Sequence, residues 1–182
     1  GVQTLSRLEC SAERIRIGAT APLASLCRHP QLSQLATCLT QAAANVGSTQ
    51  IRNMATLGGN VANASPCGDS IPALLVLGAD VGLLQADGTV RRCPLQDILL
   101  QAGRTRLRHN EAIIDFSFEA APPTRRSAFA KLGIRSAVTI SRMNAAIVVD
   151  LAPAGHVITQ AHVAFGSLAP VAFEDATLAA VL

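Results

Sequence analysis

The residues best suited to chemistry form the short run Thr56-Leu57-Gly58-Gly59-Asn60. Because glycine has no Cβ, Gly58 and Gly59 are expected to take positive φ and to let a large ligand approach the backbone. Successive N–H groups in such a bend form a concave nest that binds anions. Thr56 and Asn60 add side-chain donors on either side. The run therefore predicts a phosphate or pyrophosphate site, although two glycines with polar neighbours also make an ordinary turn.

A carboxylate follows this run and is the second candidate for contact with the same ligand. Asp69 lies nine residues beyond Asn60. Its oxygens are acceptors only, so they suit the hydroxyl groups of a sugar or a ribityl chain. We therefore expect Asp69 to contact the sugar-like part of a bound molecule.

Other patterns that carry chemistry are absent from the sequence. No GxGxxG follows a strand, and the Walker A, GxSxG and HExxH motifs are missing. The four histidines stand singly. The cysteines are odd in number and form no CxxC pair, which argues against a disulfide framework and against a zinc or iron–sulfur site. We therefore predict no catalytic side chain and no metal ligand; the cysteines are Cys10, Cys27, Cys38, Cys67 and Cys93.

The composition is that of a well-filled core with a weakly charged surface. The chain has 182 residues, of which 49% are hydrophobic and 15% charged, and its net charge is +3. No apolar run approaches the roughly 20 residues of a membrane-spanning helix. Nucleic-acid binding is disfavoured because the positive charge is scattered and both Trp and Tyr are missing. Unpaired cysteines favour reduced thiols and a cytoplasmic protein.

The first two thirds of the chain predict helices around a few strands. Residues 13–17 alternate like a strand, and Thr20 is expected to cap a helix that has Pro22 in its first turn. Apolar residues recur at helical spacing over 31–46, so we expect one amphipathic helix there. Residues 47–70 break this pattern. A loop beyond about 12–15 residues in a compact domain is usually functional or disordered, and the apolar residues within it argue against disorder.

The remainder predicts a short helix followed mainly by strands. Residues 71–77 form the helix, 81–85 and 89–93 a hairpin, and 112–118 a strand. Pro122 and Pro123 mark a linker over 120–126. Three further strands are expected at 128–132, 145–151 and 157–165, before a helix that begins near 173. Segregated helices and hairpins indicate an α+β fold.

Residues 50–66 and Asp69 together resemble a known family. They are similar to the second FAD-binding signature of molybdenum hydroxylase flavoproteins, which include the FAD domains or subunits of xanthine dehydrogenase, aldehyde oxidoreductase and carbon monoxide dehydrogenase. The resemblance continues through 15–19, 88–97, 111–118, 129–135 and 166–170. It implies an FAD-binding type 2, PCMH-like, subdomain. The start of a CO-dehydrogenase-flavoprotein C-terminal domain with an antiparallel sheet would follow.

The resemblance also implies roles for individual residues. Thr56, Leu57, Gly58, Gly59 and Asn60 would wrap the FAD pyrophosphate, and Asp69 sits where the family has an acidic FAD contact. Ile113 matches an aliphatic residue that lies against the cofactor, and Val46 a larger apolar one. Lys131 lies near the position of a flavin-side lysine, but an exposed lysine in an ordinary strand is the alternative for this residue.

The sequence departs from the family at both ends. A glycine-rich loop of AGGT type, which the family carries before the strand at 13–17, is not found. We therefore expect residues 1–122 to be an FAD-binding domain without its N-terminal AGGT-loop subdomain, and 123–182 to be an incomplete C-terminal domain. Losing two hydrogen bonds to the pyrophosphate costs about 3–6 kcal/mol. The chain alone should then bind FAD weakly, with an affinity poorer than micromolar in isothermal titration.

The function implied by the resemblance is electron transfer. In the family, a molybdopterin subunit hydroxylates the substrate and a subunit with 2Fe–2S clusters passes electrons to FAD, which reduces NAD or another acceptor. This chain would then be one part of a hetero-oligomer, with the molybdopterin-binding large subunit and the 2Fe–2S small subunit as partners. A flavin-free scaffold subunit is the alternative of a different class. A phosphate-ligand enzyme is a third, which the lack of a base or nucleophile disfavours.

Overall fold

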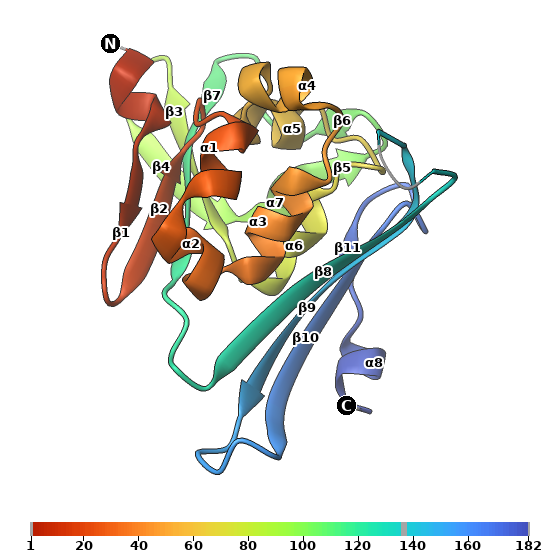
Figure 1. Cartoon of the computed structure of the whole chain (residues 1–182). Helices are drawn as coiled ribbons and strands as arrows, with labels where there is room; N and C mark the ends of the chain where they lie inside the picture. The colour runs from red at the N-terminus through yellow and green to blue at the C-terminus, as the bar shows by residue number, and fades with distance from the viewer. Residues whose placement is uncertain (1, 136–137, 182) are drawn as a thin grey trace.

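Two antiparallel sheets enclose a layer of helices in this protein (Figure 1). The computed structural model describes residues 2–135 and 138–181. The first sheet has the strand order β1-β2-β7-β3-β4 and the second the order β11-β10-β9-β8. In the order in which they pair, the strands of the first sheet are Leu8–Cys10, Arg14–Gly18, Glu111–Glu119, Asp80–Gln85 and Val90–Pro94. Those of the second are Phe173–Glu174, Ile158–Gly166, Ser141–Leu151 and Arg125–Gly133.

Short helices fill the space between the sheets. Helix α3 lies against β8, α6 lies against β9 and β10, and α5 contacts β7. A small hairpin of β5 (Leu99–Gln101) and β6 (Arg104–Thr105) follows α7. The helices α1 to α8 are Leu23–Arg28, Pro30–Leu35, Thr37–Ala44, Thr49–Met54, Leu57–Ala62, Ser70–Val76, Leu95–Ile98 and Ala176–Ala179, and a 3-10 turn covers Val2–Ser6.

One apolar cluster runs through both sheets and the helices between them. Phe116 and Phe118 of β7 are its largest fully buried side chains, and every residue of α6 is buried. The second sheet contributes small residues to the same cluster, among them Ala146, Val148 and Ala164. Small side chains let the helices approach that sheet closely, so α6 lies at the centre of the molecule.

The predicted α+β class is confirmed, and most expected strands lie close to their predicted positions. The helix expected over 31–46 is instead two helices, because Ala36 leaves the helical region at φ −147°. The segment 47–70 is not a long loop, since it contains α4 and α5. Thr20 does not cap α1; Pro22 holds that position. The helix expected from residue 173 onward is shortened to α8 after the two residues of β11.

Candidate functional site

The run at Thr56 to Asn60 begins helix α5 rather than forming an open bend. Thr56 is the N-cap, and its Oγ1 accepts a hydrogen bond of 3.0 Å from the Gly59 amide. The Asn60 amide bonds to the Thr56 carbonyl at 2.9 Å. The positive-φ glycines of the described chain lie elsewhere, at Gly47, Gly78, Gly88, Gly103 and Gly155. The expectation that Gly58 and Gly59 take positive φ is therefore wrong, because a helix N-terminus needs ordinary helical φ there.

The first turn of α5 is fixed to the segment that follows β2. The Leu57 amide donates to the Ala21 carbonyl at 3.1 Å, and the Gly58 amide to the Ala19 carbonyl at 2.8 Å. A Cβ on Gly58 would lie 2.7 Å from that same Ala19 oxygen. Gly58 is thus required for close backbone packing. A nest of free amides at this run is also wrong, since the amides of residues 57–60 all have partners within the chain.

Donors from side chains remain available on the exposed side of this turn. Gly59 is exposed, and a Cβ there would meet only the Thr56 hydroxyl, at 3.0 Å. Asn60 Oδ1 accepts from Ser70 Oγ at 2.6 Å, which directs the Asn60 amide nitrogen away from that bond. No described residue accepts from this nitrogen or from the Thr56 hydroxyl. These groups fit an anion such as the pyrophosphate of FAD, with side-chain donors in place of the expected nest.

Thr20 is a polar residue beside this turn whose role the sequence did not reveal. Its hydroxyl is buried and has no hydrogen-bond partner among the described residues. Thr20 lies between Ala19 and Ala21, whose carbonyls receive the amides of α5. Residue types alone could not show that the backbone carbonyls on both sides of Thr20 accept hydrogen bonds from α5.

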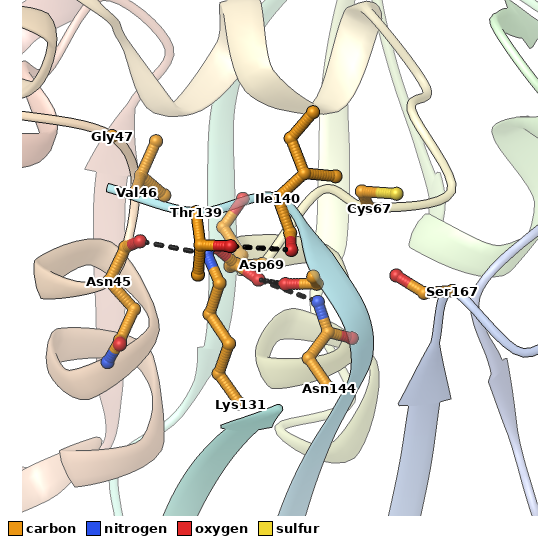
Figure 2. A network of polar contacts seen from close by, with 12 residues as sticks. Asn45, Val46, Gly47, Cys67, Asp69, Lys131, Thr139, Ile140, Asn144 and Ser167 are labelled. Atoms are coloured by element: carbon orange, nitrogen blue, oxygen red, sulfur yellow. Dashed lines mark hydrogen bonds and ion pairs between the residues drawn. The ribbon is translucent and has the colours of Figure 1, made fainter. Parts of the chain in front are cut away.

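Asp69 lies at the centre of a buried polar network (Figure 2). Its Oδ2 accepts from Lys131 Nζ at 2.6 Å, and its Oδ1 accepts from Ser141 Oγ at 2.6 Å and from Asn144 Nδ2 at 2.7 Å. The residue is 3% exposed. It occupies the N-cap position of α6 but makes no capping bond with its side chain. Because its oxygens already have three donors, its contact with a sugar or ribityl hydroxyl stays a prediction.

Lys131 points into the molecule rather than into solvent. Its side chain is 7% exposed, and Nζ also donates to the Asn45 carbonyl at the end of α3, at 3.0 Å. The alternative of an ordinary surface lysine is therefore wrong. Lys131 is also one of the residues that line a cavity of about 330 Å³; the others include Asn45, Gly133, Arg135, Val138 and Thr139.

The two groups of candidate residues are connected through neighbouring residues. Asn60 of α5 bonds to Ser70, which directly follows Asp69. Ile113 is half-buried in β7, and the next carbonyl, that of Ile114, accepts from the Ala19 amide at 2.9 Å. Ile113 thus belongs to the strand that α5 contacts. Val46 is half-buried after α3, one residue beyond the Asn45 carbonyl that receives Lys131.

An ion pair in which an arginine bonds to both oxygens of a carboxylate lies at the edge of the first sheet. Arg91 Nε and Nη2 donate to the two Glu111 oxygens at 2.7 and 3.0 Å. These bonds, together with the Arg108 amide, lower the pKa of Glu111 to about 2. In the core, burial raises the pKa of the Cys38 thiol to about 11. Cysteine reactivity requires the thiolate. We therefore expect the thiol of Cys38, which is buried in the core, to be unreactive.

The described residues contain no group of three or more His, Cys, Asp or Glu side chains placed to hold a metal ion. Within the same residues, no helix has both the length and the apolar character needed to cross a membrane.

The family model described as "FAD binding domain in molybdopterin dehydrogenase" matches residues 1–118. The chain is 31% identical to the nicotinate dehydrogenase FAD-subunit of Eubacterium barkeri, over 85% of this chain and 53% of that protein. It is also 31% identical to a putative xanthine dehydrogenase FAD-binding subunit of Escherichia coli, over 72% of this chain and 45% of that protein. The chain thus spans about half the length of these relatives.

A solved structure has the same fold. Carbon monoxide dehydrogenase from Hydrogenophaga pseudoflava superposes with a TM-score of 0.92 at 23% identity, over 99% of this chain and 61% of that one. The two sheets and the helices between them are therefore arranged as in that solved structure.

Proposed function

Because this chain belongs to the family of FAD-binding domains in molybdopterin dehydrogenases, we propose that it is the flavin-carrying, electron-transfer part of a molybdenum hydroxylase. FAD is the cofactor of this family, and when bound it supplies the exchange of single electrons and hydride equivalents. In this proposal the 2Fe–2S clusters and the molybdopterin belong to partner subunits. NAD or another acceptor takes the electrons, and the complex is cytoplasmic.

One observation supports the site most directly: the first turn of α5 has side-chain donors at Thr56 and Asn60 from which no described residue accepts. Gly59 leaves room for a ligand against the backbone, and the Thr56 hydroxyl and the Asn60 amide have unused hydrogens. We propose that these groups hold the pyrophosphate. Leu57 and Gly58 support them from below by packing, since both are buried.

The remaining residues of the proposed site orient and enclose the cofactor. Ile113 offers an apolar surface on β7. Lys131 offers an ammonium group beside the cavity at the end of α3, and Asp69 fixes that group. We propose no covalent step for any side chain of this chain. The residues bind the cofactor, exclude water and set the charge around it.

Gly59→Ala tests the pyrophosphate contact with opposite effects on stability and on binding. Glycine inside a helix costs about 0.5–1 kcal/mol relative to alanine, so this variant should be as stable as the unaltered chain or slightly more stable. The added methyl group should crowd the ligand by about 1–3 kcal/mol and weaken FAD binding by about tenfold or more. Isothermal titration with FAD and thermal unfolding measure the two effects.

Gly155→Ala is the matched control. Gly155 lies in the β9–β10 turn, at the opposite end of the molecule from α5 (Figure 1). Its φ is +79°, so alanine there should lower stability and leave FAD binding unchanged. Equal FAD affinity in Gly59→Ala and the unaltered chain would contradict the proposed site.

The alternative function is a scaffold subunit without flavin. No structural feature favours it over FAD binding, because the donors at Thr56 and Asn60 are present. The flavin absorption spectrum of the complex purified from its native source separates the two. A complex with molybdenum and iron but without flavin absorption would support the scaffold and overturn the proposal.

A further inference from the structure

Lys131 is the only lysine in the sequence; every other basic side chain among the 15 Lys and Arg residues is arginine. It is also the least exposed cation among the ion pairs of the described residues, at 7% for the side chain. Lysine carries a compact charge with three donors, whereas the arginine fork binds both oxygens of a carboxylate at once. At this buried position the cation is therefore a lysine, which bonds to one oxygen of Asp69 and leaves the other oxygen for further donors.

The carboxylate oxygen of Asp69 that Lys131 does not contact accepts hydrogen bonds from two neutral donors of β9. Lys131 occupies Oδ2, whereas Ser141 and Asn144 both donate to Oδ1. Asn144 is the register partner of Lys131 across the β8–β9 pair. The two strands thus approach Asp69 together, and the carboxylate is held from both sides.

The hydrogen bond to Asp69 orients the side-chain amide of Asn144 and leaves its oxygen without a partner among the described residues. Its Nδ2 faces Asp69, and its Oδ1 is left buried without a partner among the described residues. Turning the amide over would place an acceptor against the carboxylate, which is worse than one unsatisfied acceptor. The contact with Asp69 therefore determines how Asn144 sits.

The ammonium group has one donor left over. Asp69 and the Asn45 carbonyl accept two of its hydrogens, and no described residue accepts the third. Lys131 also lines the cavity of about 330 Å³. Asp69 is one of the two acceptors that hold the ammonium group in place.

We propose that Ser141 and Asn144 are positioning residues for the flavin site, which act through Asp69 to hold the Lys131 ammonium beside the cavity. This inference rests on the proposed function. With Oδ1 occupied, Asp69 offers the lysine only Oδ2 and fixes its direction. Without those donors the carboxylate turns and no longer holds the ammonium in place, so that Lys131 becomes accessible to reagents in solvent.

Ser141→Ala tests the role, because it removes one donor and little volume. The single lysine allows a direct readout without FAD: the rate at which an amine-reactive acylating reagent modifies Lys131, followed by peptide mass spectrometry. A lost hydrogen bond to a charged group should raise this rate by about tenfold. FAD affinity, from isothermal titration, should fall by about tenfold, as it does for metals when an outer hydrogen-bond partner is removed.

Three controls separate positioning from loss of structure. Ser127→Ala removes another bond between the second sheet and the helices, from the Cys38 amide to Ser127 Oγ at 3.1 Å, and should change neither readout. Ser141→Thr keeps the hydroxyl and should restore both. Alkylation of the buried Cys38 reports global opening and should stay slow in every variant.

The outcomes distinguish this inference from the proposed function. If Lys131 is acylated at the same rate in Ser141→Ala and in the unaltered chain, the positioning role is overturned. Parallel increases at Lys131 and Cys38 also overturn it, since they indicate general opening. If Ser141→Ala alone exposes Lys131 but the complex purified from its native source has no flavin absorption, the positioning of Lys131 stands and the proposed function fails.

Discussion

Asp69 and Asp115 are two nearly buried carboxylates that the protein neutralises in different ways. Asp115 lies on the first sheet, where Arg92 donates to both oxygens at 2.7 and 2.9 Å. Asp69 lies between the helices and the second sheet, where Lys131 reaches only one oxygen. The side chain of Asp115 is 12% exposed and that of Asp69 is 4% exposed.

The two pairs differ in how the cation binds the carboxylate, since both Asp115 and Lys131 line a cavity. The Arg92 fork fixes the plane of Asp115 by bonding to both of its oxygens, as Arg91 does with Glu111. Gly82 lies beneath Asp115 and has no Cβ to obstruct it. Lys131 instead leaves one carboxylate oxygen for neutral donors and keeps one unused N–H. We infer that the arginine pairs hold the sheet together, and that the lysine pair also prepares a charge for a ligand.

The largest effect should follow from removing Asp69. Asp69→Ala leaves the Lys131 ammonium buried without its counter-charge. Breaking a buried pair in this way costs about 3–5 kcal/mol. Urea unfolding measures the loss. Asp115→Ala should cost less, because Arg92 is 34% exposed and can turn toward water.

The control for this comparison removes both charges. Asp69→Ala combined with Lys131→Met should recover most of the lost stability, since an uncharged, packed pair is often as stable as a buried ion pair. If the double variant is as unstable as Asp69→Ala, the packing around Asp69, and not the unpaired charge, determines the loss.

A loss of stability of intermediate size is expected from a substitution at Gly82, which packs against the Arg92–Asp115 pair. A Cβ there would lie 2.6 Å from Asp115 Oδ1 and 3.3 Å from Arg92 Nη1. Gly82→Ala must push the carboxylate and the fork aside, at a cost of about 1–3 kcal/mol. Thermal unfolding should show this, and Gly82→Ala combined with Asp115→Ala should lose less than the sum of the two. Additive losses would show that Asp115 does not press on Gly82.

The strands of this fold could be predicted from the sequence because their signals are local. Alternating apolar residues and the Asp87-Gly88 turn lie within a few positions of each other, and they placed the β3–β4 hairpin correctly. The break at Ala36 could not be predicted, because apolar spacing continues across it. Helices α4 and α5 were missed for another reason. Glycines and asparagines in 47–70 have poor helix propensity, and capping by Ser48 and Thr56 with tertiary packing overrides it.

The sequence proposed which residues form the candidate site, but the geometry of these residues could not be predicted. The residue types of Thr56 to Asn60 predicted a site in this segment, which stays a prediction, and the glycines lie in a helix N-terminus and not in a nest. Asp69 was identified without its partners. Ser141 and Asn144 are 72 and 75 positions away from it, and a distance of that kind in sequence carries no signal in residue type. Such contacts arise from how the second sheet docks.

The smallest effect should be a pH dependence at the sheet edge, where Arg91 and Glu111 meet. The fork lowers the pKa of Glu111 from 4.5 to about 2 in the folded chain. A carboxyl group with a lowered pKa in the folded state stabilises the protein fully above its unfolded pKa, and this contribution is lost as the pH falls through the folded value. The urea concentration at the unfolding midpoint should therefore decrease as the pH is lowered from 4.5 to about 2. Glu111→Gln should make this decrease with pH less steep. Glu9→Gln is the control, since Glu9 is exposed on β1 and forms no ion pair with a described residue. A slope that Glu111→Gln leaves unchanged would mean that this fork contributes nothing to stability, and the contrast with Lys131 would then rest on Asp115 alone.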